Sequence, residues 1–334
     1  MQAEQALKFA KALEPSLQRA FLKAVSTLKS DVSIRRLERA VGAGDVDAIV
    51  AALSLSAGVL TPLTEAMRAV YISTGELTLR TINQPRGRKL SIRFNGSNPN
   101  AQEYLTDRSG VKIAEILDDQ RLVIRQSLER GLAAGRNPRS TALDLVGRIK
   151  DGKRTGGVIG LTSRQSQHVQ NMRDELSDPA KASSYFQRSR RDARFDSVVR
   201  RAISDGKPVA IADIDRISGR YSDRLLQLRG ETIARTETLG AMNAASQEAM
   251  SQLVTSEGLE RKDVQKIWRA SEDERTRESH AALNGEYVKF DEAFVTITGV
   301  RLMRPADPSA PAEEVINCRC WVEHRVDWAG MANG

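Results

Sequence analysis

Four side chains near the C-terminus are of types that bind zinc, namely His280, Cys318, Cys320 and His324. If residues 318–324 form one extended strand, Cys318 and His324 lie about 20 Å apart at ~3.3 Å per residue, so one metal ion cannot bind both. A zinc site therefore requires the two cysteines on a curved turn, with His280 and a fourth ligand brought to them. Because free cysteine more often fills a core, the sequence favours buried thiols over a zinc site at His280, Cys318 and Cys320.

A basic segment follows Asp178 and Pro179, and we predict that it forms a helix over residues 179–203 that faces DNA or an acidic partner. On a helix its arginines spread over more than one face, with Asp192 and Asp196 between them, so a solvated helix with internal ion pairs is an equally good interpretation. Basic side chains without interleaved aromatic residues bind phosphates and do not read bases. The candidate nucleic-acid-binding residues are Arg188, Arg190, Arg191, Arg194, Arg200 and Arg201.

Two other segments could bind anions, but a structural role explains each of them better. The glycine-rich loop over residues 152–157 lacks the GxxxxGK[ST] spacing and no strand is predicted before it, so we interpret it as a flexible linker. Arg235 projects to the same side of a predicted helix as Leu239, and we predict an internal ion pair with an acidic residue such as Asp273. HExxH and GxSxG motifs and a Rossmann fingerprint are absent from the sequence, which contains three histidines, so we predict that the protein is not an enzyme.

The composition favours helices and a division of roles along the chain. The 334 residues suggest two domains. Hydrophobic residues make up 40% and aromatic residues 4%, which suits Ala/Leu-rich helix packing. The net charge of +8 divides into +12 over residues 1–200 and −4 over residues 201–334. The basic first part suggests binding to a polyanion or an acidic partner, and the acidic last part suggests a different function.

The sequence carries no sign of a secretory signal or a membrane span. A bridge between Cys318 and Cys320 would close a tiny, strained ring, so we expect a reducing compartment. Residues 1–21 mix charges with apolar side chains, unlike a signal peptide. The longest uncharged stretch, residues 48–64, is short for a span and contains Ser, Thr, Gly and Pro, and we predict that it is a core helix.

Hydrophobic periodicity predicts a helical body over the first two-thirds of the chain. Residues 74–100 are rich in Gly, Pro and Asn and predict an exposed connection with one strand at 90–94. Gly135 and the Asn137-Pro138 pair end one helix, and Ser140 is the expected cap of the next. The predicted helices cover residues 7–28 with a break at Pro15, 33–41, 111–132, 140–149, 162–176, 179–203 and 223–253.

Beyond Gly258 shorter apolar segments alternate with turn residues and predict a small β-sheet. The predicted strands are 264–268, 286–290, 294–297, 300–303 and 320–326, with one helical turn between 274 and 283. The fold class is therefore mainly α with a C-terminal α+β domain, an elongated helical body followed by a small β-sheet cap. The predicted regions are an N-terminal helical region with an exposed connection (1–100), a basic helical region (101–219), an α+β domain (220–327) and a tail (328–334).

Four separate blocks of the last third resemble the phage head morphogenesis, or minor head, proteins, the family of the phage Mu protein F and its relatives in other tailed phages. The blocks are 233–237 with Asn243, 266–268, 273–280 with 283–285, and 305–308 with 311–320, so the resemblance covers about residues 220–326. Many relatives carry cysteines in the block at 277–280, where this chain has Arg277 and His280, and this departure weakens any metal inference from the family. The residues that carry the motif are Arg235, Glu237, Asn243, Trp268, Asp273, Arg275, Thr276, His280, Gly285, Asn317, Cys318, Arg319 and Cys320.

The resemblance implies a structural, non-catalytic minor capsid protein that is present in few copies at the portal vertex of the virion. It implies assembly in the host cytoplasm and a role in making or stabilising DNA-filled heads, including DNA packaging or retention. The implied partners are the portal protein, a major capsid or scaffold protein, and packaged double-stranded DNA bound without sequence preference. Neither a membrane partner nor a cofactor is implied.

Within the family-like segment we predict one buried hydrogen-bonded cluster made of Arg235, Glu237, Asp273, Arg275 and Asn317. Such a cluster would join the long helix to the loops of the α+β domain and would satisfy the buried guanidinium.

Two alternative functions stay open. Domains of this family also occur joined to toxin-like enzymes, and Arg235 with Glu272 and Glu274 faintly resembles ADP-ribosyltransferase residues. A strand-borne Ser/Thr block and a nicotinamide pocket are not visible in the sequence. The second alternative is a sequence-independent nucleic-acid-binding protein that acts outside the virion. Loss of binding at raised salt fits either binding role, whereas co-purification with a portal ring separates them.

Overall fold

The computed structural model describes residues 1–84 and 90–328, and these form two compact units. The first unit contains Met1–Ala20, Leu63–Gly110 and the chain from Glu231 onward, and the second contains Phe21–Pro62 and Val111–Gly230. Three helices have several turns in each unit: α1 (Ala3–Ser30), α5 (Pro99–Ala133) and α9 (Ile211–Glu257). The predicted sequential regions stay a prediction, and residues 329–334 of the predicted tail lie outside the described residues.

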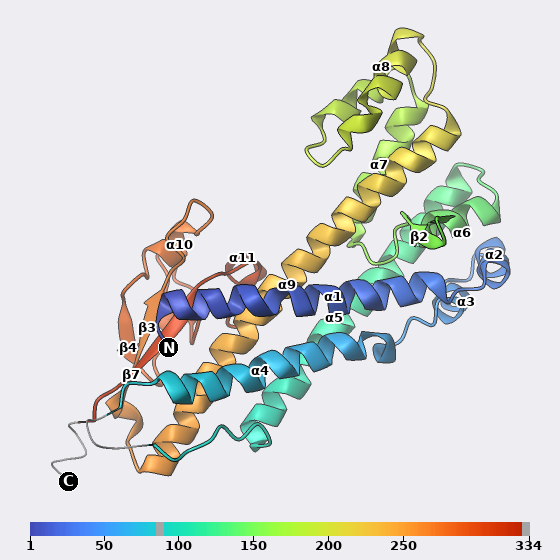
Figure 1. The fold of residues 1–334 in the computed structure, drawn as a ribbon. Helices are drawn as coiled ribbons and strands as arrows, with labels where there is room; N and C mark the ends of the chain where they lie inside the picture. The colour runs from blue at the N-terminus through green and yellow to red at the C-terminus, as the bar shows by residue number, and fades with distance from the viewer. Residues whose placement is uncertain (85–89, 329–334) are drawn as a thin grey trace. The chain divides into compact units, whose positions relative to one another are not determined.

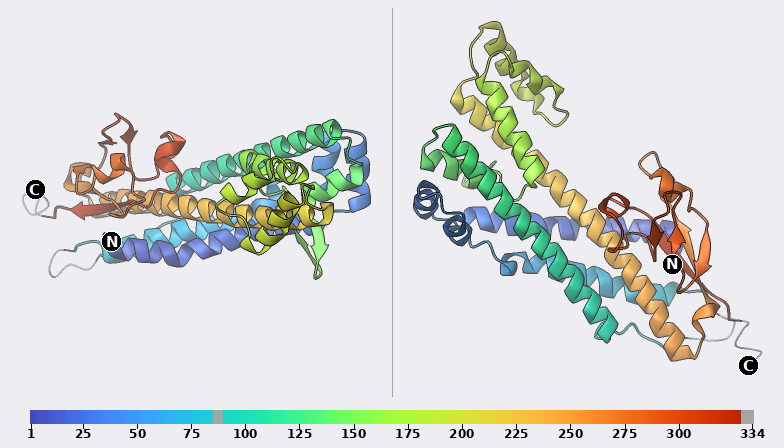
Figure 2. Two further views of the ribbon diagram at one scale, coloured as in Figure 1. Left: turned by 90° about the horizontal axis from the view of Figure 1, so that it is seen from above. Right: turned by 180° about the vertical axis from the view of Figure 1, so that it is seen from behind.

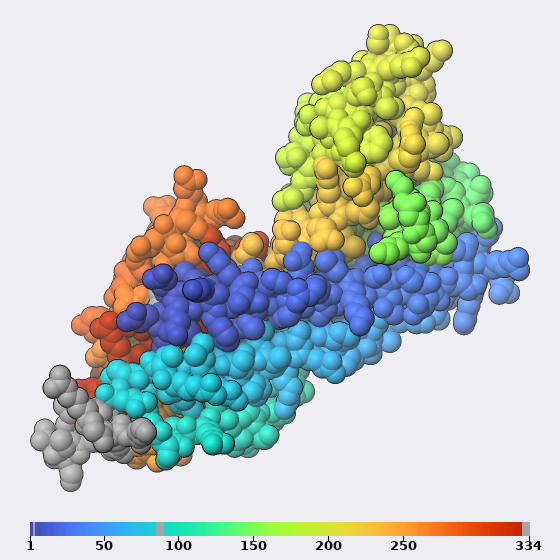
Figure 3. Space-filling model, viewed as in Figure 1, coloured from blue at the N-terminus to red at the C-terminus, as the bar shows by residue number. Residues whose placement is uncertain are grey.

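The first unit combines helices with a small antiparallel sheet. Residues 3–20 of α1 run beside α4 (Thr61–Thr81) (Figure 3). The central strand β3 (Val264–Arg269) pairs with β4 (Tyr287–Lys289) on one side and with β7 (Trp321–Val326) on the other (Figure 1). The remaining elements of this unit are η4 (Arg261–Asp263), α10 (Glu278–Ala281), the paired strands β5 (Phe294–Val295) and β6 (Arg301–Leu302), and α11 (Ala312–Val315).

The second unit is helical apart from one hairpin, in which β1 (Arg148–Lys150) pairs with β2 (Lys153–Thr155) (Figure 2). Its core contains aliphatic residues from most helices of the unit and the buried side chains of Tyr185 and Tyr221. The helices are the second part of α1, α2 (Ile34–Gly42), α3 (Val46–Ala52), η1 (Ala57–Leu60), the second part of α5, α6 (Pro138–Val146), α7 (Ser163–Ser177), η2 (Ala182–Gln187), η3 (Ala193–Phe195), α8 (Asp196–Ser204) and the first part of α9.

A separate, smaller core lies in the α+β part of the first unit. It contains nine buried residues, Trp268, Leu283, Phe294, Leu302, Ala306, Val315, Cys318, Cys320 and Val322. The ring of Trp268 meets that of Phe294 edge-on, with the centroids 5.2 Å apart. Two of the nine residues are cysteines, so the thiols are an appreciable part of this core.

The predicted fold class is confirmed, because the described residues are mainly helical and the sheet of three strands lies in the C-terminal part. Local sequence signals placed several elements correctly. The helix from Thr162 begins with a capping box, in which the Thr162 side chain and Gln165 satisfy each other's backbone amides. The predicted strands at 264–268 and 320–326 correspond to β3 and β7.

Several local predictions are wrong, and three of them concern single elements. Pro15 does not break the first helix, because losing one backbone hydrogen bond costs less than disrupting an apolar row that includes the fully buried Leu17 and Phe21. Residues 90–94 form no strand, since the ring of Phe94 packs directly against Gly75 of α4 instead. The cap of α6 is Asn137, whose side chain accepts from the backbone amide of Ser140, so the helix begins before the predicted cap.

The uncharged stretch at 48–64 is not one core helix. It contains the end of α3, the short helix η1 and the start of α4, separated at Ser54, which has a positive φ of 51°. Among the described residues no single helix is long and apolar enough to cross a membrane, and one bent pair, Val46–Ala52 with Ala57–Thr81, meets the length and composition criteria only when its two parts are taken together.

The predicted basic helix at 179–203 is wrong. The segment contains η2, a turn, η3 and the helix α8, which begins at Asp196. The Asp192 side chain accepts from the backbone amide of Arg194 and so starts a new turn, which divides the arginines between short elements.

Candidate metal centre

His280, Cys318 and Cys320 come together from two separate segments of the α+β part. Cys318 and Cys320 lie after α11 and before β7, on a turn in which Asn317 has a positive φ of 59°. The amide of Cys318 donates to the carbonyl of Val315 at 3.1 Å, which keeps the turn curled against the end of α11. His280 is in the short helix α10, whose single turn is positioned by packing and not by its own length.

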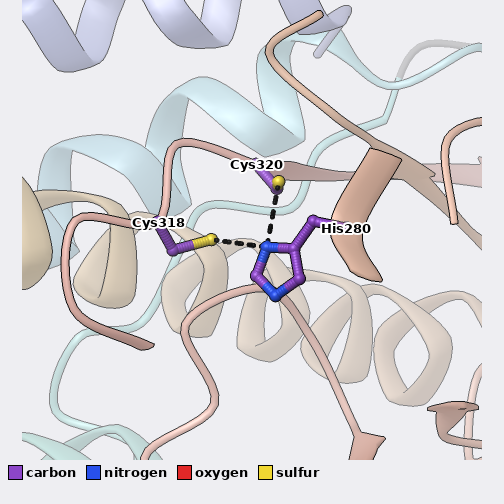
Figure 4. A group of neighbouring side chains, drawn as sticks. All are labelled: His280, Cys318 and Cys320. Carbon is purple, nitrogen blue, oxygen red and sulfur yellow. Dashed lines mark hydrogen bonds between the residues drawn. The ribbon is translucent and has the colours of Figure 1, made fainter. Parts of the chain in front are cut away.

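The three side chains are close and almost completely buried (Figure 4). Sγ of Cys318 is 3.6 Å from Nδ1 of His280, and Sγ of Cys320 is 3.5 Å from the same nitrogen. Their candidate ligand atoms all lie within 4.8 Å of one another. Both thiols are buried, as the sequence analysis favoured. They also lie on a curved turn close to His280, which is the arrangement that a zinc site would require. His324 lies elsewhere, with its Nδ1 3.0 Å from Oγ of Ser246.

The far side of the His280 ring faces a buried carboxylate. Nε2 of His280 is 2.8 Å from Oε2 of Glu314, although the two are poorly aligned for a hydrogen bond. The Glu314 carboxylate also accepts from Oγ of Ser279 at 3.1 Å. Trp268 packs edge-on against the imidazole with the ring centroids 5.1 Å apart. The ring is therefore held between two sulfur atoms, a carboxylate and an indole.

The pKa values of the two thiols are shifted in opposite directions. A hydrogen bond from Cys320, together with the neighbouring His280, lowers the pKa of the Cys318 thiol well below its ordinary value. The pKa of Cys320 is raised because its proton is held by Cys318 and because burial penalises a second thiolate. This environment favours one thiolate in the pair, and thiolate is the form of cysteine that binds metals.

Asn243 of α9 supports the turn that carries the thiols. Its Nδ2 donates to the carbonyls of Leu239 and Cys320 at 2.9 and 3.1 Å, and its Oδ1 accepts from the amide of Val322 at 2.9 Å. The side chain is fully buried. Asn243 therefore attaches the end of the thiol turn to the long helix.

The predicted single cluster of five polar residues is wrong. Glu237 is buried and accepts two 2.9 Å bonds from Arg108 of α5, which the sequence analysis did not identify as its partner. Arg235 does not pair with Asp273. Its Nη1 donates to Oδ1 of Asn317 at 3.3 Å and its Nε lies 3.9 Å from Glu14, a residue about 220 positions away in the sequence that no local pattern connects to it.

Asp273 belongs to a second, more exposed group. It accepts from both terminal nitrogens of Arg319, and this contact lowers the pKa of the carboxyl to about 2. The backbone amide of Arg275 donates to the Asp273 side chain at 3.0 Å, and that of Thr276 donates to the Asp273 carbonyl at 2.8 Å, so both form a turn after Asp273.

Gly285 has a φ of 85°, a conformation that favours glycine, and its amide donates to the carbonyl of Trp268.

The basic residues predicted to bind nucleic acid are largely engaged in ion pairs within the second unit. Arg188 pairs with Glu175, Arg191 with Asp196, and Arg194 with Asp192. The pairs of Arg200 with Asp196 and of Arg201 with Asp205 are longer, at 3.8 and 3.9 Å. The side chains of Arg194, Arg200 and Arg201 are 71, 68 and 86% exposed, so they present charge to solvent despite these pairs.

A pocket of about 680 Å³ in the second unit contains both acidic and basic side chains. Arg148 and Arg173 approach Asp215 at 2.9 and 2.6 Å. The three other arginines of its lining, Arg194, Arg216 and Arg220, also form ion pairs. The five arginines of this lining are thus engaged in ion pairs, although the lining, with Lys150 as a further basic residue and Asp144 and Asp215 as the acidic ones, keeps an excess of positive charge.

Comparison with protein families supplies the decisive observation. Residues 193–323 match the family described as Phage Mu protein F like protein. The C-terminal part of this chain is therefore similar to the Mu protein F-like family. No curated protein and no solved structure matches it. The Mu protein F-like segment begins at Ala193, upstream of the predicted start near residue 220, so it includes α8 and all of α9. His280, Cys318 and Cys320 all lie inside it.

The sequence did not indicate the roles of Glu314 and Arg108. Glu314 lies within the Mu protein F-like segment, but no spacing rule indicated that it would reach His280 from the short helix α11. Arg108 lies outside the matched segment, in the part of α5 that belongs to the first unit. The sequence shows Arg108 only as one charged residue within a helical segment, and this pattern does not indicate which residue it pairs with.

Proposed function

We propose that this protein is a minor head protein of a tailed phage, which acts at the portal vertex during head assembly and DNA packaging or retention. The observation that carries the proposal is the match of residues 193–323 to the Mu protein F-like family, which points to phage head morphogenesis. The portal protein is the proposed main partner, with a major capsid or scaffold protein as a second one. The protein acts structurally and performs no catalysis.

A virion role also fits the chemistry of the described residues. The buried polar groups with clear partners serve packing, as with Arg108 and Glu237 on two helices. The most unusual group, His280 with the two cysteines, is closed off from solvent and so is poorly placed to act on a substrate. Neither the toxin-type transferase nor the nucleic-acid-binding protein outside the virion gains a supporting observation among the described residues.

We propose that packaged double-stranded DNA contacts the exposed arginines of α8 and the preceding turn, without sequence preference. Arg200 and Arg201 lie at the solvent-facing side of α8, and their ion pairs are long enough for phosphates to compete. Arg190 is also exposed. Each phosphate contact adds about 0.9 to the slope of log affinity against log salt, so the contribution of these residues is measurable.

The DNA contact is tested with a triple variant, Arg190→Ala, Arg200→Ala and Arg201→Ala, in a salt titration of duplex DNA binding. Arg35→Ala, Arg36→Ala and Arg39→Ala together give a matched control, because they remove three exposed arginines from another helix, α2, which is not proposed to contact DNA. The first variant should bind more weakly with a slope reduced by about 1 per lost contact, and the control should bind like the unchanged protein. Equal affinity of all three proteins at low salt would overturn the DNA proposal.

The portal role is tested by deleting the gene from the phage and supplying it from a plasmid. Heads made without the protein should show reduced infectivity and DNA content, and the protein from the plasmid should co-purify with portal rings. Normal infectivity and DNA content in the deletion phage would overturn the proposed role in assembly. Recovery of the protein with the portal fraction distinguishes a virion component from a cellular nucleic-acid-binding protein.

A further inference from the structure

We propose that His280, Cys318 and Cys320 bind one zinc ion that holds the α+β part of the first unit together. The donor set is one imidazole nitrogen and two sulfur atoms, which suits zinc, and its members come from α10 and from the turn before β7. Among the described residues, these three side chains are the protein ligands that meet at this position. Because these three residues leave one position of a tetrahedron open, the ion would be enclosed together with one water molecule as its fourth ligand.

The two sulfur-to-nitrogen distances match those of a tetrahedral zinc site. With Zn–S bonds of about 2.3 Å, a Zn–N bond of about 2.05 Å and tetrahedral angles, the sulfur-to-nitrogen distance is about 3.6 Å. The two observed distances to Nδ1 of His280 are 3.6 Å from Cys318 and 3.5 Å from Cys320. An ion at the centre of this group therefore requires little movement of the three side chains.

A simple thiol–imidazole hydrogen bond accounts less well for the arrangement. Nδ1 of an imidazole has one position in the ring plane, either for a hydrogen or for a lone pair. Here two sulfur atoms approach that single nitrogen at nearly equal distances. A metal ion satisfies all three atoms at once, because it replaces the thiol protons and accepts the nitrogen lone pair.

The surroundings of His280 resemble the outer contacts of a zinc ligand. Histidines that bind metals through one nitrogen usually direct the other nitrogen to a carboxylate, which fixes the ring. Nε2 of His280 lies 2.8 Å from Glu314, yet it is buried without an aligned hydrogen-bond partner. Such a nitrogen is costly when left unsatisfied. Coordination at Nδ1 would fix the ring in the orientation in which Nε2 donates to Glu314.

Burial and charge agree with a structural ion. The relative exposures of His280, Cys318 and Cys320 are 1, 1 and 2%. Two thiolates balance the double charge of Zn²⁺, so the ion and its sulfur ligands add no net charge to the interior. The small core here contains nine residues, and an ion that joins two of its segments compensates for limited apolar burial.

The direct test uses the full-length protein, purified without chelators under reducing conditions. Because the sequence contains only two cysteines, any zinc released by a thiol-reactive mercurial comes from Cys318 and Cys320. We expect about one zinc per chain by elemental analysis, released in proportion to the mercurial added. Replacement by Co²⁺ should give a thiolate-to-cobalt absorption band. Protein without zinc that also fails to bind added Zn²⁺ or Co²⁺ when reduced would overturn the proposal.

Variants separate the ligands from their surroundings. Cys320→Ser should bind little zinc and should give a weaker thiolate-to-cobalt band than the unchanged protein. His168→Gln, at an exposed histidine of α7, should retain both the zinc and the band. Glu314→Gln should keep the metal with an affinity lowered about 10- to 100-fold. If Cys320→Ser does not fold, zinc release and the cobalt spectrum of the unchanged protein still test whether the two cysteines bind the metal. Undiminished zinc in Cys320→Ser would contradict the assignment.

Discussion

The ion pair between Arg108 and Glu237 provides the sharpest test of how the first unit is stabilised. The Glu237 side chain is 2% exposed and that of Arg108 is 13% exposed, and two 2.9 Å bonds join them. Glu237→Leu removes the carboxylate and leaves the buried guanidinium without these two bonds. The expected loss is about 3–5 kcal/mol in the free energy of unfolding, the usual cost of removing one partner of a buried pair.

The same reasoning predicts recovery when both charges are removed. In the double variant Arg108→Met with Glu237→Leu, apolar side chains of similar volume replace the pair, and stability should return to within about 1 kcal/mol of the unchanged protein. Asp291→Asn is the matched control, because Arg261 and Asp291 are 53 and 61% exposed and such pairs contribute about 0–1 kcal/mol. Arg261 and Asp291 lie in the same unit as the buried pair.

Urea unfolding followed by tryptophan fluorescence reports on this unit, because all three tryptophans of the sequence, Trp268, Trp321 and Trp328, belong to it. With a slope of about 2.5 kcal/mol/M, the single variant should shift the midpoint by roughly 1–2 M. A shift below 0.4 M, which is ~1 kcal/mol at that slope, would refute the reasoning. A double variant as unstable as the single one would refute it equally.

Three further predictions concern the same unit. Burial lowers the pKa of His324 to about 3, and the nearby N-terminal amine and Lys266 act in the same direction. Because the unfolded state then binds more protons between about pH 3 and pH 6.5, stability should fall by about 2 kcal/mol from pH 7 to pH 5, and His324→Gln should flatten this dependence in urea titrations at each pH. Gly75→Ala places a Cβ 2.5 Å from the Phe94 ring and should cost about 1–3 kcal/mol, whereas Gly110→Ala, where nothing lies within 4 Å, should not destabilise α5. Zinc removal by a chelator should lower the fluorescence-detected urea midpoint of the unchanged protein and leave that of the Cys320→Ser variant unaltered, and equal shifts in both would contradict the zinc proposal.

The elements that sequence predicted well are those with local signals. The capping box at Thr162 and Gln165 and the alternating apolar residues of β3 act within a few positions, so they appear in the sequence without knowledge of the fold. The arginine-rich segment failed because Asp192 binds a nearby backbone amide and interrupts the helix that composition favoured.

The candidate site was predicted in part for a different physical reason. The sequence indicated His280, Cys318 and Cys320 as the residues that a zinc site would need, because an extended strand keeps His324 away, but it favoured buried thiols without a metal. Whether the segments meet depends on packing between α10 and the turn after α11, which sequence spacing does not encode. The partners of Arg235 and Glu237 were missed because Glu14 and Arg108 reach them across more than a hundred residues.

Cryo-electron microscopy of the phage head, reconstructed without imposed symmetry, tests the proposed function most directly. We predict density for the β4-β3-β7 sheet and the long helix α9 at the portal vertex, in contact with the portal ring. Heads that are complete and infectious but contain none of this protein would contradict it.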